Sequence, residues 1–123
     1  MDYSSTYSQQ QKAYKTAILW IKYALDHDHI INTLKRSREK FELLSENNPD
    51  IDTYDQMISA FTVLISNHEY KGWSIERIRD YLKKLMSHYS RKLENMNSEY
   101  SNSFGKLKFN TPSSWQQLIN YRS

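Results

Sequence analysis

The sequence contains no cysteine, and only two glycines and two prolines occur among its 123 residues. Without cysteine, the chain has no disulfide scaffold, no thiolate metal ligand and no thiol nucleophile. An all-β domain of this length needs many tight turns, and these depend heavily on glycine and proline. The shortage of both residues therefore favours helices joined by few loops.

Long apolar runs are also absent. The longest is the five-residue run Ala17-Ile18-Leu19-Trp20-Ile21, whereas a membrane-spanning helix needs about 20 apolar residues. The opening residues, Met1-Asp2-Tyr3-Ser4-Ser5, lack the basic start and apolar core of a signal peptide. We therefore expect a cytoplasmic protein with no membrane span.

Aromatic residues, by contrast, are plentiful and make up 14% of the chain. Each buries a large apolar area, which helps a chain of one-domain length to form a core. The formal net charge of +3 is distributed unevenly: residues 49–70 carry four acids and no lysine or arginine, whereas 71–99 and 100–123 each sum to +3. This asymmetry concerns partners rather than the fold.

Apolar residues recur at steps of three and four, the period of one helix face, in four parts of the chain. We predict an all-α, four-helix bundle-like core with helices near residues 9–26, 29–46, 51–67 and 74–100, preceded by a frayed segment 1–8. After an extended tail segment, Thr111-Pro112 predicts the start of a short C-terminal helix near 112–121. The bundle domain is thus 1–100, and 101–123 form a C-terminal linker and docking helix.

The breaks between the helices differ in strength. Asn47-Asn48-Pro49-Asp50 is the clearest, because proline cannot continue a helix and asparagine and aspartate favour turns. Asp26-His27-Asp28-His29 is weaker: Asp28 could cap a second helix, or the first helix could run through. The pattern favours a break or bend there.

The longest predicted helix starts at Ser74, a preferred N-cap residue, with Trp73 and Ile78 placed to form a hydrophobic staple. The residues of its apolar face are Ile75, Ile78, Leu82, Leu85, Tyr89, Leu93 and Met96. The opposite face is charged. We expect this helix to bury its apolar face against the others, antiparallel to the acidic helix before it.

The run from Gly72 to Leu82, GWSIERIRDYL, resembles the G-[FW]-S-[LI]-E-x-I-R-x-L-L run of MerR-type regulators. In that family the run follows a DNA-reading winged helix and leads into a dimerising helix. The resemblance implies a capped amphipathic helix and self-association. No helix-turn-helix and wing precede the run here, so no DNA-reading residues carry over. In size, charge and helix-plus-tail design the chain also resembles bacteriocin immunity proteins, at the level of architecture alone.

Motifs for catalysis are missing: the sequence has no G-x-S-x-G, no phosphate loop and no G-x-G-x-x-G. The cluster Asp26-His27-Asp28-His29 is the one that suggests a metal site, and its His-Asp pair resembles that of HD-type phosphohydrolases. Residues two apart point in different directions on a helix, however, and matching ligands elsewhere are absent. We interpret the cluster as a solvated junction, and we predict a non-enzymatic protein with no catalytic residues, metal or cofactor.

The remaining interpretation is a small protein-binding or regulatory protein of bacterial or phage type, such as an inhibitor, adaptor or immunity-type factor. Its partner is another protein or a second copy of the chain. The predicted partner-binding residues are the apolar anchors of the C-terminal segment: Phe104, Phe109, Trp115, Leu118 and Ile119. These anchors could equally fold back and cover the bundle core.

The alternative function is that of a nucleic-acid-binding accessory protein that uses a basic helix face. Its candidate phosphate-binding residues are Lys35, Arg36, Arg38, Arg77, Lys84 and Arg91. Interspersed acids dilute both groups, as they do on ordinary solvated helices.

Overall fold

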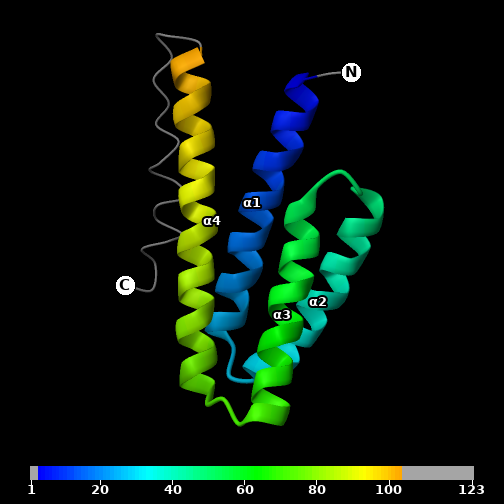
Figure 1. The fold of residues 1–123 in the computed structure, drawn as a ribbon, viewed down its shortest axis with the longest axis vertical. Coiled ribbons are helices and arrows are strands. Elements are labelled where there is room, and N and C mark those ends of the chain that lie inside the picture. The colour runs from blue at the N-terminus through cyan, green and yellow to red at the C-terminus, as the bar shows by residue number, and fades with distance from the viewer. Residues whose placement is uncertain (1–2, 104–123) are drawn as a thin grey trace.

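The computed structural model describes residues 3–103, which form four α-helices (Figure 1): α1 (Tyr3–Asp26), α2 (Ile30–Asn47), α3 (Asp52–Lys71) and α4 (Ile75–Ser103). Within this range no strand occurs, so the all-α prediction is confirmed. None of these helices is both long and apolar enough to cross a membrane. The predicted helix near 112–121 and the five predicted partner-binding residues lie outside the described range.

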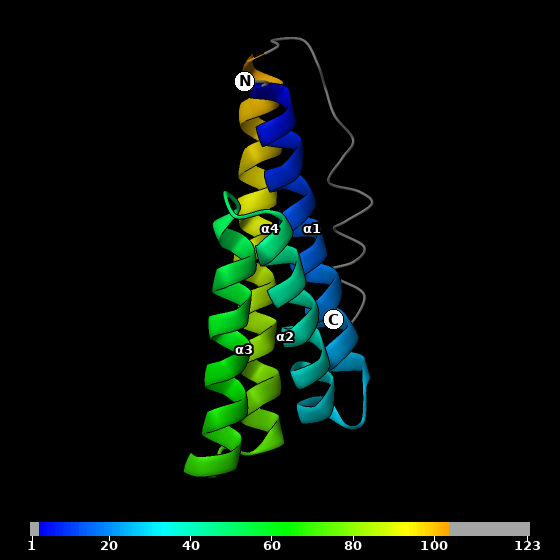
Figure 2. The ribbon, with the colours of Figure 1, turned by 90° about the vertical axis from the view of Figure 1, so that its right-hand side faces the viewer.

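The four helices alternate in direction but do not pack equally. α1 lies along α4, and α2 lies along α3, with further contacts from α1 to α2 and α3 (Figures 1 and 2). α3 and α4 follow one another in the chain, yet they barely touch. The bundle is therefore two antiparallel pairs joined mainly through α1, and it is open between α3 and α4.

The core forms where the predicted apolar faces meet. Phe41 of α2 lies at its centre: its ring centroid is 5.9 Å from that of Phe61 and 6.1 Å from that of Tyr54, both on α3. Trp20 of α1 lies off the main stripe of its helix and packs its ring edge against Phe41 at 6.4 Å. α1 is thus covered on a second side by α2.

The apolar stripes of α3 and α4 are confirmed by burial. The fully or nearly buried members on these two helices are Tyr54, Met57, Phe61, Leu64, Ile65, Ile78, Leu82, Tyr89 and Leu93. Ile58 of α3 and the remaining predicted members on α4, Ile75, Leu85 and Met96, are half-buried. Each buried aliphatic or aromatic side chain contributes about 1.5–3 kcal/mol through removal of apolar surface from water.

Two helix boundaries differ from the prediction. α1 starts at Tyr3 rather than near residue 9, so the expectation of a frayed segment 1–8 is wrong for residues 3–8, while residues 1–2 lie outside the described range. The far end of α4 provides polar partners for these turns: the Tyr7 hydroxyl donates to the Met96 carbonyl at 2.8 Å, and Gln11 Nε2 donates to Asn97 Oδ1 at 2.9 Å. Such long-range bonds leave no periodic signal in the sequence.

α3 continues to Lys71, beyond the predicted end near residue 67, and stops at Gly72. Gly72 adopts φ 72°, a left-handed conformation that favours glycine, and its amide and that of Trp73 both donate to the Asn67 carbonyl. A glycine after a helical run is a recognised stop signal, so this end was readable from the sequence.

The predicted break between the first two helices is confirmed, since α1 ends at Asp26 and α2 begins at Ile30. The predicted cap is wrong. His29 occupies the N-cap position, its side chain makes no capping hydrogen bond, and Asp28 lies one residue too early. The cap at Ser74 is confirmed, because its Oγ accepts from the Arg77 amide at 3.1 Å.

Candidate functional site

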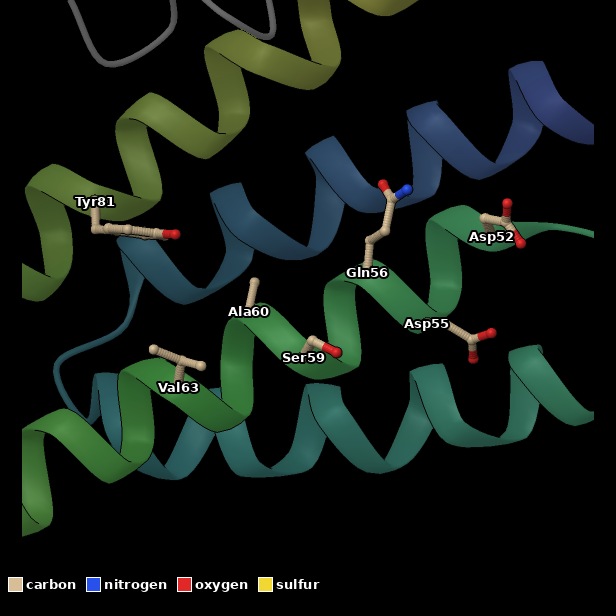
Figure 3. A pocket seen from close by; sticks show the side chains of 7 residues that line it. All are labelled: Asp52, Asp55, Gln56, Ser59, Ala60, Val63 and Tyr81. Carbon is tan, nitrogen blue, oxygen red and sulfur yellow. The ribbon is translucent and has the colours of Figure 1, made fainter.

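The gap in the packing between α3 and α4 contains an open groove of about 570 Å³ (Figure 3). It is lined by Asp52, Asp55, Gln56, Ser59, Ala60 and Val63 of α3 and by Tyr81 of α4. α1 packs against both α3 and α4. In this view α1 passes behind the space between α3 and α4, and its position keeps the two helices apart. The groove is thus a consequence of the way the bundle is paired.

The α3 wall arises from a second stripe on that helix. Gln56, Ser59, Ala60 and Val63 recur at offsets 0, 3, 4 and 7, so they share one face beside the buried stripe. Ser59 and Ala60 are small, which leaves room above the helix backbone. Val63 is 50% exposed, a large value for a β-branched aliphatic side chain on a regular helix.

The opposite wall is aromatic and is fixed at two points. Tyr81 is 40% exposed, and its ring lies 6.4 Å from that of Trp73 in the α3–α4 turn. Further along α4, the hydroxyl of buried Tyr89 donates to Gln56 Oε1 of α3 at 3.1 Å, a polar bridge between the two walls. The groove therefore has anchored sides although the helices have little direct contact.

Several side-chain contacts fix the α3–α4 turn at the closed end of the groove. The guanidinium of Arg77 lies 3.9 Å from the centroid of the Trp73 ring, a cation–π contact, and His68 Nδ1 lies 2.7 Å from the Trp73 carbonyl oxygen. With the Ser74 cap and the left-handed Gly72, these contacts fix the direction in which α4 leaves α3.

The charge in the groove lining is carried by the α3 wall. Asp52 and Asp55 lie in the first turn of α3, near the positive end of its helix dipole, and the Ser45 hydroxyl donates to Asp55. On α4, burial lowers the pKa of His88, and the nearby cations Lys92 and Arg91 lower it further, but these three residues are not among those that line the groove. A ligand in the groove therefore meets carboxylates on the α3 wall and Tyr81 on the α4 wall.

The six candidate phosphate-binding residues fall on two helices, α2 and α4, that do not pack along each other. On α2, Lys35 forms a 2.7 Å ion pair with Glu69 of α3, and Arg38 donates to Thr62 at 3.4 Å. Arg36 is exposed. The fold therefore does not join the α2 group to the α4 group in one surface.

On α4, the predicted basic stripe is present but partly engaged. Arg77, Lys84 and Arg91 are all exposed, and Arg77 stacks on Trp73 as described. Asp80 and Glu94, also exposed, interrupt the stripe.

The histidine–aspartate junction is held by backbone contacts. His27 Nδ1 lies 2.9 Å from the Tyr23 carbonyl oxygen, and Arg79 of α4 donates to the carbonyls of Leu25 and His27. Among the side chains that the structure describes, those of residues 7–97, no three from histidine, aspartate or glutamate are grouped so that they could hold a metal ion.

The groove was not predicted from the sequence. One signal was present: Val63 and Tyr81 are large apolar residues outside the main stripes of their helices. Their proximity depends on how α3 and α4 are spaced, which periodicity does not give.

Comparison with known proteins adds no relative to this geometry: no protein-family model, curated protein or solved structure matches the chain.

Proposed function

We propose that the chain is a non-enzymatic binding protein whose α3–α4 groove takes an amphipathic helix of a protein partner. The observation that carries the proposal is an anchored groove with exposed Val63 and Tyr81 toward one end and two carboxylates toward the other (Figure 3). Helix-in-groove recognition uses such a surface: apolar anchors enter the groove, and charged flanks meet its rim. Regulatory proteins such as inhibitors and adaptors commonly act through sites of this kind.

The chemistry of the lining defines the partner. Asp52 and Asp55 favour lysine or arginine on the flank of the ligand, while Ala60, Val63 and Tyr81 favour leucine-sized anchors at successive turns. A groove of about 570 Å³ accommodates a few such side chains. The expected partner therefore presents a short helix that is apolar on one face and basic beside it.

A pair of synthetic helices tests the proposal. One peptide of about 14 residues carries leucines at one helical face and lysines on the flanks, and the matched peptide carries glutamates in place of the lysines. Fluorescence anisotropy with the full chain should show about tenfold tighter binding of the lysine peptide. Its lysines are attracted to the carboxylates of the groove, whereas the glutamates of the matched peptide are repelled by them.

Matched variants locate the binding. Val63→Lys should weaken binding of the lysine peptide about tenfold, because it removes an apolar contact and adds a like charge, whereas Leu43→Lys on α2, where the native side chain is 55% exposed, should leave it unchanged. Equal weakening by both variants, or equal binding of the two peptides, would exclude the groove as the docking site.

The nucleic-acid alternative has less support, because Lys35 and Arg38 already bind α3 and the two basic groups lie on separate surfaces. Its test uses a duplex and a single-stranded oligonucleotide as probes. Binding that falls steeply with ionic strength, and that is lost on reversing the charges of Arg77, Lys84 and Arg91, would favour this alternative over the groove.

A further inference from the structure

The C-terminal segment of the chain has the chemistry that the groove requires. Residues 104–123 contain Lys106, Lys108 and Arg122 and no acid. The same segment carries the apolar anchors Phe104, Leu107, Phe109, Trp115, Leu118 and Ile119. We infer that residues 104–123 dock in the α3–α4 groove of their own chain, as a resident ligand that a partner must displace. This inference rests on the proposed function of the groove.

Charge favours this groove over the exposed apolar site at Leu19 of α1. Asp52 and Asp55 lie in its lining, and the segment is purely cationic. Leu19 on the outer face of α1 is as exposed as Val63, but Lys12, Lys15 and Lys22 share that side of its helix. A cationic segment is repelled there and attracted to the groove.

The length of the segment also fits. From Ser103 back to Tyr81, α4 spans about 33 Å at 1.5 Å per residue. Residues 104–111 reach about 26 Å when extended. This length is enough for the chain to run back along α4 and pass the open end of the groove before residue 112. The predicted helix 112–121 is about 15 Å long, and the α3 wall from Asp52 to Val63 is about 16 Å.

The spacing of the apolar anchors fits a helix that docks in the groove through one face. Trp115, Leu118 and Ile119 lie at offsets 0, 3 and 4, so on a helix they form one face. That face packs on the Ala60–Val63 wall and on Tyr81. Because so short a helix is marginal alone in water, it needs such a surface to form.

Disulfide trapping tests the inference in the full chain, which has no native cysteine to interfere. The test variant combines Ser114→Cys with Val63→Cys, and the matched controls combine Ser114→Cys with Leu43→Cys or Leu19→Cys, at sites that are 50%, 55% and 54% exposed. In a glutathione buffer, the intramolecular disulfide should form about tenfold more readily with Val63→Cys, as expected for a raised effective concentration.

Three further results decide the outcome. Asp52→Lys should reduce trapping at Val63→Cys, and Tyr81→Cys as a second groove position should also trap Ser114→Cys. Equal trapping at all three sites, preferred trapping at Leu19→Cys, or a disulfide formed only between chains would overturn the inference. Circular dichroism confirms that each variant is folded.

The inference and the proposed function can fail separately. If trapping is not selective but the lysine peptide still binds at Val63, the groove is a partner site and the segment does not occupy it. If trapping is selective, replacing Trp115 and Leu118 by serine should strengthen peptide binding severalfold, because the resident ligand is weakened. Unchanged peptide affinity in that variant would contradict displacement.

Discussion

Tyr89 is the residue at which the two helix pairs meet. Its side chain is 2% exposed, its ring lies 6.0 Å from that of Tyr14 on α1, and its hydroxyl donates to Gln56 of α3. Burial raises the pKa of Tyr89 to about 12, with smaller contributions from Tyr14 and Tyr81. Burial also raises the pKa of Tyr54, partly offset by a hydrogen bond with Thr16.

These shifts predict alkaline destabilisation. A folded-state pKa of about 12, against 10.0 for the unfolded chain, means that the folded state holds its proton while the unfolded state loses it. The associated stability is present below pH 10 and is lost between pH 10 and 12, by up to about 3 kcal/mol.

Tyr89→Phe isolates this effect. Urea unfolding of the variant should show a shallower loss of stability between pH 10 and 12 than the native chain, because the phenylalanine does not titrate. At pH 7 the variant should lose about 1 kcal/mol from the hydrogen bond to Gln56. If the free energy of unfolding fell in parallel with pH in the variant and in the native chain, Tyr89 would have the same pKa in the folded and the unfolded state.

Arg79 is a second residue whose role the sequence does not reveal. Its guanidinium donates to the carbonyls of Leu25 at 2.6 Å and His27 at 3.3 Å, which would otherwise lack partners at the end of α1. By spacing alone, Arg79 resembles the exposed arginines of the same helix. Only the position of α1 beside α4 gives it a structural function.

Arg79→Met should therefore lower the free energy of unfolding by about 1.5–3 kcal/mol, the range for hydrogen bonds from a charged group. Arg91→Met, at an exposed position of the same helix, should change it by no more than about 0.5 kcal/mol. Urea denaturation of both variants provides the comparison. A similar loss in the two would mean that the contact with α1 contributes nothing.

At the scale of elements, local signals predicted the fold where they were present. Pro49, Ser74 and the three- and four-residue steps placed the four helices and one cap, and Gly72 could have placed the end of α3 as well. The start of α1 and the cap of α2 were missed. The first depends on bonds to α4, and the second position, His29, carries no side-chain cap at all.

The turn between α3 and α4 gives a prediction at this scale. Gly72→Ala should destabilise the chain by about 1–2 kcal/mol, since alanine strains at φ 72°. An added Cβ would meet no atom within 4 Å, so the loss comes from the backbone conformation and not from a clash. Gly72→Asn should lose less, because asparagine tolerates this conformation better. Thermal unfolding followed by circular dichroism measures both, and equal losses would point to another cause.

At the scale of the whole molecule, the sequence indicated an acidic third helix and a basic fourth, but not the groove between them. Pairing by charge would have placed α3 and α4 in close contact. The observed pairing instead places α1 on α4 and α2 on α3. Which faces pair depends on side-chain fit between distant segments, so Val63 and Tyr81 could not be predicted to share a site. The predicted partner-binding residues of the C-terminal segment stay a prediction.

The most direct measurement for the groove is methyl NMR of the full chain, titrated with the lysine-flanked peptide. Val63 reports on the groove, while Leu19 and Leu43 report on similarly exposed positions of α1 and α2. The account predicts chemical-shift changes at the Val63 methyl groups, with Leu19 and Leu43 unmoved. Changes centred on Leu19 or Leu43, or none at Val63 while the peptide binds, would contradict a docking site between α3 and α4.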